Sequence, residues 1–196
     1  MSRPEEIEGL LRRLAPQVLA ALLRRHRSLD ICEDAVQEAL LAAATSWAVS
    51  GLPDNPRGWL LTVATRRLID DVRSERTRRT REDRVAMGAP PSELLTLGPE
   101  SEPSVDRDRD DTLALLIMCC HPSLSAPSQI ALTLRAVGGL STAEIAACFF
   151  VSETTMAQRI SRAKQTIRDA GARFEMPPDP ELTARLAAVM HVLYLI

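Results

Sequence analysis

Apolar residues recur every three to four positions over most of this chain, a spacing typical of amphipathic helices. The stretch IEGLLRRLAPQVLAALL shows this spacing at Ile7, Leu10, Leu11, Leu14, Val18 and Leu22. Aromatic residues make up only 3% of the sequence, so a core has to be built from Leu, Ile, Val and Ala. Because aromatic side chains are among the strand formers, their scarcity favours helices over sheets. We therefore expect an all-α fold.

The 196 residues are enough for one medium domain or two small ones. The helical patterning has a long interruption that contains Pro90, Pro91, Pro99 and Pro103 and has no sustained periodicity. This stretch is expected to be a flexible linker between two small helical domains. The predicted organisation is a first domain at 5–82, the linker at 83–105, a second domain at 106–173 and the start of a C-terminal extension at 174–196.

Punctuating residues predict where helices in the first domain begin and break. Pro16 is expected to bend or divide the first helix. Asp30 is expected to cap the second helix, with Glu33 in the capping-box position three residues later. Turn-forming residues then indicate a loop. The expected second helix, loop and third helix cover 30–47, 50–58 and 59–79.

The net charge of −2 hides an uneven distribution of charge along the chain. The stretch RSERTRRTREDR at 73–84 is strongly basic, whereas GPESEPSVDRDRDD at 98–111 is mostly acidic. Such asymmetry suggests a local nucleic-acid surface beside an acidic segment. A solvated helix end is the alternative interpretation of the basic stretch.

The N-terminal sequence MSRPEEIEGLLRR is charged and amphipathic, which is not typical of a signal peptide. No stretch approaches the roughly 18 apolar residues that a membrane span needs. We therefore expect a cytoplasmic protein without a membrane partner. Cysteines in that compartment are expected to be reduced thiols, here Cys32, Cys119, Cys120 and Cys148.

The stretch LSTAEIAACFFVSETTMAQRISRAKQTIR at 140–168 predicts two short helices around a tight break. Ser141 with Glu144 forms a predicted capping box for the first helix, and Ser152 is a predicted cap for the second. In the second helix Met156, Ile160, Ala163 and Ile167 share a narrow apolar arc. The opposite polar face suits entry into a DNA major groove. A helical hairpin with a solvated polar face fits the same pattern.

Three elements in order resemble a bacterial extracytoplasmic-function (ECF) RNA polymerase sigma factor of the sigma-70 family. They are DAVQEALLAA at 34–43, NPRGWLLTVATRRLIDDVRSERTRR at 55–79 and the helix-turn-helix above. The first domain resembles sigma region 2 and the second resembles region 4. The stretch LLIMCCHPSLSAPSQIALTLRAVGGLSTAEIA further resembles a subgroup with a C-terminal helical extension, often of tetratricopeptide type. The apolar end at Ile196 is expected to reflect truncation of that extension.

The resemblance implies two protein contacts and two DNA contacts. Region 2 would bind the clamp helices of the largest subunit of core RNA polymerase, and region 4 would bind the flap of the second-largest subunit. The implied clamp-binding residues are Asp34, Gln37, Glu38 and Leu41. Residues implied to read the −10 element as a melted strand are Asp54, Asn55, Arg57, Trp59, Arg66, Arg73 and Arg76. Residues expected to read the −35 element as a duplex are Thr154, Thr155, Gln158, Arg159, Ser161 and Arg162.

Several of these assignments have structural alternatives. A solvated helix face would explain the polar residues of 34–41, and Trp59 at a helix start is typical of a packing anchor. The acidic linker residues would lie where RNA later passes, or they would simply set the spacing between domains. These linker residues include Glu100, Glu102 and Asp106.

The pair Cys119 and Cys120 followed by His121 invites a metal or redox hypothesis. Adjacent cysteines on a helix point about 100° apart and make poor joint zinc ligands, so burial as small hydrophobes is the favoured interpretation. No spacing in the sequence indicates a catalytic residue, a metal site or a cofactor, and we expect no enzyme activity.

The sequence thus leads to a sigma factor that binds core RNA polymerase and promoter DNA. One alternative is an autonomous dimeric helix-turn-helix regulator. Another is a thiol- or metal-dependent protein built on Cys119, Cys120 and His121. An anti-sigma factor or the chain's own extension would regulate the sigma factor. The apolar residues of the last helix at 181–196 would pack on either domain or on the extension; they are Leu182, Leu186, Val189 and Leu193.

Overall fold

The computed structural model describes residues 4–26, 28–83 and 105–195, with side chains described for 5–26, 28–70, 111–178 and 181–194. These residues form helices and no strand, which confirms the predicted all-α fold. The helices are α1 (Pro4–Leu23), α2 (Leu29–Ser50), α3 (Pro56–Asp83), α4 (Val105–Cys119), α5 (Ala126–Ala136), α6 (Thr142–Cys148), α7 (Glu153–Asp169) and α8 (Asp179–Leu195). Most of the predicted linker, including Glu100 and Glu102, lies outside the described residues, and Asp106 lies in the first turn of α4.

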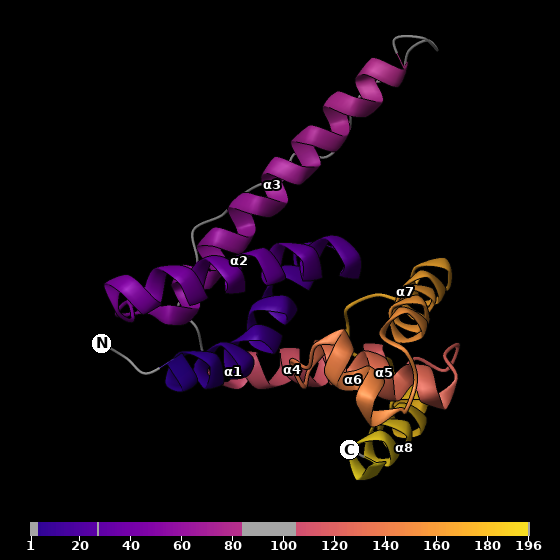
Figure 1. Ribbon diagram of the computed structural model, residues 1–196. Coiled ribbons are helices and arrows are strands. Elements are labelled where there is room, and N and C mark those ends of the chain that lie inside the picture. The colour runs from indigo at the N-terminus through magenta and orange to yellow at the C-terminus, as the bar shows by residue number, and fades with distance from the viewer. Residues whose placement is uncertain (1–3, 27, 84–104, 196) are drawn as a thin grey trace.

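Helices α1, α2 and α3 pack together as a first bundle (Figure 1). Their apolar stripes supply its core, including Val18, Leu22, Val36, Leu60 and Leu68, all of which are buried. Figure 1 shows that α3 extends well beyond the other helices of this bundle. The bundle therefore holds the start of α3 firmly and projects its C-terminal end.

Pro16 does not divide α1, which is helical from Pro4 to Leu23. Proline removes one backbone hydrogen bond in a helix interior, which costs about 3 kcal/mol or more in an exposed helix. Here Ala15, Val18 and Leu19 are buried on both sides of the proline. The packing of these buried side chains against neighbouring helices keeps α1 helical across Pro16.

The predicted start of the second helix is wrong. Helix α2 begins at Leu29 after Ser28, whose side chain makes no capping hydrogen bond, and Asp30 lies inside the first turn. Glu33 does not close a capping box; its carboxylate instead forms ion pairs with Arg135 and Lys164. Two cations supplied by distant helices compete successfully with a local backbone amide for this carboxylate.

Helices α4 to α7 form a second group, and α8 packs against α4 and α5. Val189 and Val192 of α8 are buried with Ile117 of α4 and with Cys120, which directly follows α4. Of the four apolar residues predicted to pack, Val189 is buried and Leu182 is partly buried, whereas Leu186 and Leu193 are exposed. The last helix therefore packs on the second helical group.

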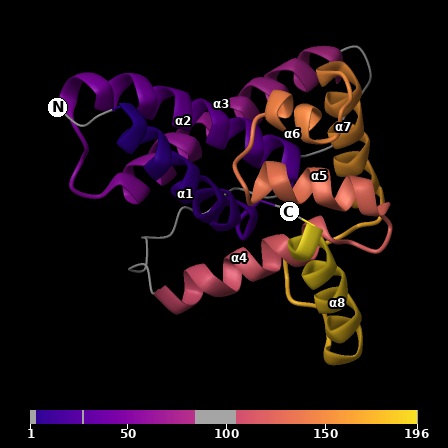
Figure 2. The same cartoon turned by 60° about the horizontal axis from the view of Figure 1, so that its bottom comes forward.

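The two groups also pack against each other, through a contact between α4 and α1 (Figures 1 and 2). Buried residues of both groups belong to one hydrophobic cluster, which includes Leu19 and Leu22 of α1 with Leu115 and Met118 of α4. Within the described residues, none of the helices combines the length and apolar character that crossing a bilayer demands.

Candidate nucleic-acid interface

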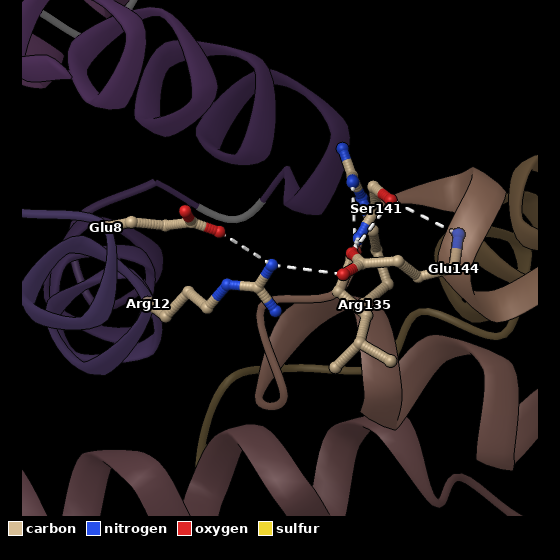
Figure 3. Close-up of polar contacts among 6 residues, drawn as sticks. Glu8, Arg12, Arg135, Ser141 and Glu144 are labelled. Atoms are coloured by element: carbon tan, nitrogen blue, oxygen red, sulfur yellow. Dashed lines mark hydrogen bonds and ion pairs between the residues drawn. The ribbon is translucent and has the colours of Figure 1, made fainter. Parts of the chain in front are cut away.

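A capping box starts α6, as the sequence predicts. The Ser141 amide donates to Glu144 Oε2 at 2.8 Å, and the Glu144 amide donates to Ser141 Oγ at 3.2 Å. Hydrogen bonds that the Ser141 amide and the Ser141 hydroxyl donate to the Glu144 carboxylate lower its pKa to about 2, with a further contribution from Arg12. Figure 3 shows the Arg12 side chain reaching Glu144 from α1, with 3.0 Å between Arg12 Nη2 and Glu144 Oε1.

The break between α6 and α7 contains a residue in a strained backbone conformation. Phe150 has a φ of 52° and is 97% exposed. This left-handed conformation is costly for a residue with a Cβ, and glycine or asparagine is more usual in it. The sequence predicts a tight break between the two helices, but it does not predict that a phenylalanine adopts this conformation.

Helix α7 begins with the predicted cap, since the Thr155 amide donates to Ser152 Oγ at 3.2 Å. All four residues of its predicted apolar arc are buried: Met156, Ile160, Ala163 and Ile167. This packing fixes which face of α7 points outward.

The outward face of α7 carries the predicted −35 residues. Thr154, Thr155, Gln158, Ser161 and Arg162 are exposed. Arg159 is half-buried, and its guanidinium lies 5.3 Å from the centroid of the Phe149 ring. The exposed amide, hydroxyl and guanidinium groups are those that contact base edges and phosphates in a major groove.

The predicted −10 residues are spread along the loop before α3 and along α3 itself. Asp54 and Asn55 lie in the loop, where Asn55 Oδ1 accepts a hydrogen bond from the Gly58 amide at 2.8 Å. Asn55 thus caps α3, a role that the sequence analysis missed although Pro56 follows it at the first helical position. Arg57 is half-buried and Arg66 is exposed. Arg73 and Arg76 lie in α3, but their side chains are not among those described.

Trp59 packs edge-on against Trp47, with 5.4 Å between the ring centroids. Trp47 is fully buried and Trp59 is half-buried. This contact joins the start of α3 to the end of α2 and agrees with the packing-anchor interpretation of Trp59.

The predicted polymerase-binding residues lie on α2. Asp34, Glu38 and Leu41 are exposed at i, i+4 and i+7 spacing and so share one face, and Gln37 beside them is half-buried. Leu41 is 69% exposed, and Glu38 pairs with Arg67 of α3 at 3.2 Å. An exposed leucine surrounded by polar side chains resembles the apolar centre and polar rim of a protein interface.

The structure separates the side chains of the hypothetical metal or thiol site. Cys119 is buried in the main hydrophobic cluster and Cys120 in the smaller cluster under α8. Burial raises the pKa of both thiols, which keeps them protonated near neutral pH. In the part of the chain that the structure describes, no three His, Cys, Asp or Glu side chains gather as metal ligands would.

Ion pairs between the two helical groups were also missed by sequence reasoning. Glu33 Oε1 lies 2.6 Å from Arg135 Nε, and Glu33 Oε2 lies 2.6 Å from Lys164 Nζ. Asp30 pairs with Lys164 and with Arg168. More than a hundred residues separate the members of each pair, and helical periodicity carries no signal for contacts of this kind.

Comparison with known proteins agrees with this architecture. The sigma-70 region 2 family model matches residues 10–78, and the sigma-70 region 4 family model matches residues 114–167. The chain is 44% identical over 187 residues to an uncharacterized protein of Rhizobium meliloti, an alignment that covers 92% of this chain and 42% of that protein. No solved structure matches the chain significantly.

Two relatives from Mycobacterium tuberculosis carry functional names. The chain is 27% identical over 179 residues to the probable ECF RNA polymerase sigma factor SigI, covering 91% of this chain and 60% of that protein. It is 33% identical over 137 residues to the ECF RNA polymerase sigma factor SigL, covering 69% of this chain and 72% of SigL. The chain thus spans less than two thirds of the Rhizobium protein and of SigI, but most of SigL. With both sigma-70 regions present in order, the chain belongs to the ECF RNA polymerase sigma factors.

Proposed function

We propose that the chain binds core RNA polymerase and directs promoter-specific transcription initiation. The observation that carries this proposal is that one chain presents two outward surfaces on two sigma-70 regions. These surfaces are the polar face of α7 in region 4 and the face of α2 that carries Asp34, Glu38 and Leu41 in region 2. A protein that only bound DNA would have no use for the second surface.

Region 4 would read the −35 element as duplex DNA through the outward face of α7. Gln158 and Arg162 are exposed near the middle of this face, where base edges would come within reach. Removing a side chain that reads a base costs about 1–3 kcal/mol, which is roughly a 5- to 150-fold loss of affinity.

Region 2 would read the −10 element as a melted strand along the α2–α3 loop and α3. A base that leaves the stack would enter the loop around Asp54 and Arg57, and its exposed edges would be read there. Arg66 and the basic C-terminal part of α3 would hold the backbone electrostatically. Asn55 supports this proposal indirectly, because its cap fixes where α3 begins.

The polymerase contacts would be the clamp helices of the largest subunit for α2 and the flap of the second-largest subunit for region 4. Because this partner works in the cytoplasm, we place the chain there. An anti-sigma factor or a C-terminal extension would regulate the chain. Comparing transcription directed by this chain with transcription directed by a chain that carries the extension would test the role of the extension. Equal activity of the two chains would contradict it.

Initiation by core polymerase is the decisive measurement. Core enzyme mixed with the chain on genomic DNA fragments is expected to start transcription at new sites. Gln37→Ala with Glu38→Ala should weaken polymerase binding, with Ser46→Ala, exposed further along α2, as the control. Gln158→Ala with Arg162→Ala should weaken duplex binding, with Arg173→Ala, outside α7, as the control.

The two sets of variants should have separable effects. If the Gln37 and Glu38 changes lower DNA binding without polymerase as much as the Gln158 and Arg162 changes do, the division of labour is refuted. A symmetric footprint on a palindromic operator without polymerase, together with no initiation, would instead favour an autonomous dimeric regulator.

A further inference from the structure

A cavity of about 730 Å³ lies where the two sigma regions meet. Region 2 lines it with the turn after α1 and the first turn of α2, and region 4 lines it with the C-terminal part of α7. None of its described lining residues belongs to the surfaces assigned above to promoter DNA or to core polymerase. The volume is within the roughly 300–1,000 Å³ that is typical of sites for small molecules.

The most deeply buried part of the cavity lining is apolar. It consists of four side chains, one from each of four helices: Leu29 of α2, Leu68 of α3, Met118 of α4 and Ile167 of α7. We call these four side chains the apolar floor. Because moving apolar surface from water onto such side chains is favourable, the floor suits the apolar part of a ligand.

Cationic side chains also line the cavity. Most of them already have a carboxylate partner: Arg24 pairs with Asp111, and Lys164 and Arg168 pair with Asp30. Asp30 is itself a lining residue, but its two partners offset its charge. Arg25 differs, because its exposed guanidinium has no ion-pair or hydrogen-bond partner among the described side chains. The cavity therefore carries an unpaired positive charge at Arg25.

The charge of Arg25 acts on its neighbour His26, which lines the same cavity. Burial lowers the pKa of His26, and the positive charge of Arg25 lowers it further. His26 is therefore neutral near pH 7, and its ring nitrogens offer one hydrogen-bond donor and one acceptor. An anionic ligand beside Arg25 does not have to displace a carboxylate of the chain.

The start of α2 adds backbone donors to the cavity. Ser28 is the residue before this helix, and its side chain makes no capping hydrogen bond. The first amides of a helix have no partner within the helix and carry a partial positive charge. Because Ser28, Leu29, Asp30 and Ile31 all line the cavity, an anion bound there lies beside these amides.

We propose that this cavity binds a nucleotide, with its phosphates between Arg25 and the start of α2 and its base on the apolar floor. A nucleotide combines the two chemistries of the lining, because its phosphates are anionic and every base has an apolar π-face. An inorganic anion would leave the floor uncovered. Both sigma regions would contact the ligand, so binding would stabilise their association. The inference is independent of the proposed function, because neither DNA nor polymerase takes part in it.

Titration with ADP and GDP, followed by calorimetry, is the first test. Magnesium is left out because it would neutralise the phosphates. At least one of the two nucleotides should bind with a Kd below about 1 mM. The matching nucleoside alone and inorganic pyrophosphate alone should each bind at least about tenfold more weakly, because each keeps only half of the contacts. Equal affinity for pyrophosphate and nucleotide, or no saturation by either nucleotide, would overturn the inference.

Arg25→Ala tests the phosphate contact. This variant should bind the nucleotide about tenfold more weakly, because a charge-assisted hydrogen bond is lost. Its unfolding temperature without ligand should be unchanged, since the Arg25 guanidinium has no described side-chain partner. Arg13→Ala is the matched control, because Arg13 is equally exposed but lies on α1 outside the lining. Equal losses of affinity in both variants would show an unspecific effect of net charge and contradict the site.

Ser28→Asp separates nucleotide binding from folding. Aspartate is favourable at the position before a helix, so the variant should be at least as stable as the unaltered chain. Its carboxylate would accept hydrogen bonds from the amides of α2 and repel phosphate, so nucleotide affinity should fall at least about tenfold. Ser28→Asn caps the helix without a charge and should lose less. Unchanged affinity in Ser28→Asp would overturn the placement of the phosphates.

Methionine methyl groups locate the bound base. Met118 belongs to the apolar floor, whereas Met156 of α7 is buried outside the cavity lining. In a chain with isotope-labelled methionine methyl groups, the nucleotide should shift the nuclear magnetic resonance signal of Met118 and leave that of Met156 in place. Met118→Leu and Met156→Leu assign the two signals. A nucleotide that binds without shifting the Met118 signal would overturn the inference.

Discussion

The Glu144 carboxylate performs two tasks at once. It closes the capping box of α6 by accepting from the Ser141 amide and hydroxyl, and it pairs with Arg12 of the other region. Figure 3 shows that one oxygen serves each task. A residue that the sequence identified as a local cap is therefore also a contact between regions.

The pKa of Glu144 makes this contact dependent on pH. Its value of about 2 lies below the ordinary 4.5, so its interactions contribute fully to stability above about pH 4.5 and are lost as the pH falls toward 2. Urea unfolding of the chain and of Glu144→Gln should show a stability difference that is constant near neutral pH and shrinks below pH 4.5. A difference that stays constant down to pH 3 would contradict the assigned pKa. Glu175→Gln, at an exposed position, is the control.

At the scale of single elements, the turn between α6 and α7 is the place where local sequence and local conformation disagree. Phe150 adopts a sterically unfavourable left-handed backbone conformation, and its ring is almost fully exposed to solvent. The amides of Phe150 and Val151 donate to carbonyls at the end of α6, and Ser152 directly after them caps α7. These hydrogen bonds and the buried arc of α7 decide the path of the turn.

Relieving this strain should stabilise the chain. Phe150→Asn is expected to raise the free energy of unfolding by about 0.5–1 kcal/mol, because asparagine tolerates the left-handed region. Thermal unfolding followed by circular dichroism would measure the change. Phe150→Leu keeps the strain and removes only the ring, so it should not stabilise. Equal stabilisation by both variants would show that the exposed ring, and not the backbone, is the cause.

At the scale of the whole molecule, the two sigma regions share one hydrophobic cluster. Leu132 of α5 is fully buried in region 4, whereas both tryptophans of the sequence, Trp47 and Trp59, lie in region 2. Tryptophan fluorescence therefore reports on region 2 alone, and helical circular dichroism reports on both regions.

Comparing tryptophan fluorescence with circular dichroism tests whether the two regions unfold together. Leu132→Ala should cost about 2–5 kcal/mol by leaving a cavity in region 4. If the shared cluster couples the regions, fluorescence and circular dichroism should shift to the same lower urea midpoint. A fluorescence midpoint that stays in place while the circular dichroism transition splits would show that region 2 unfolds independently. Ala147→Gly at an exposed position of α6 provides a milder region 4 control.

The sequence determined that the chain is helical and which face of α7 is buried, because both depend on spacing along a single element. The buried arc of α7, both helix-turn-helix caps and the exposure of the polar face of α7 were predictable for that reason. The start of α2 was mispredicted because the Glu33 carboxylate can accept a hydrogen bond from a nearby backbone amide or pair with a distant cation. Helical periodicity does not indicate which of these two partners it takes.

Only the tertiary structure decided how the regions meet. The pairing of Glu33 with Arg135 and Lys164, the packing of α1 on α4 and the continuity of α1 through Pro16 all depend on side chains far apart in the sequence. Local rules predict a surface and its chemistry, but the partner of a charged group is set by which helices three-dimensional packing brings within a few ångströms. The sequence therefore determined which charged side chains each helix carries. The fold decided that the carboxylates of α2 form ion pairs with the cations of α7.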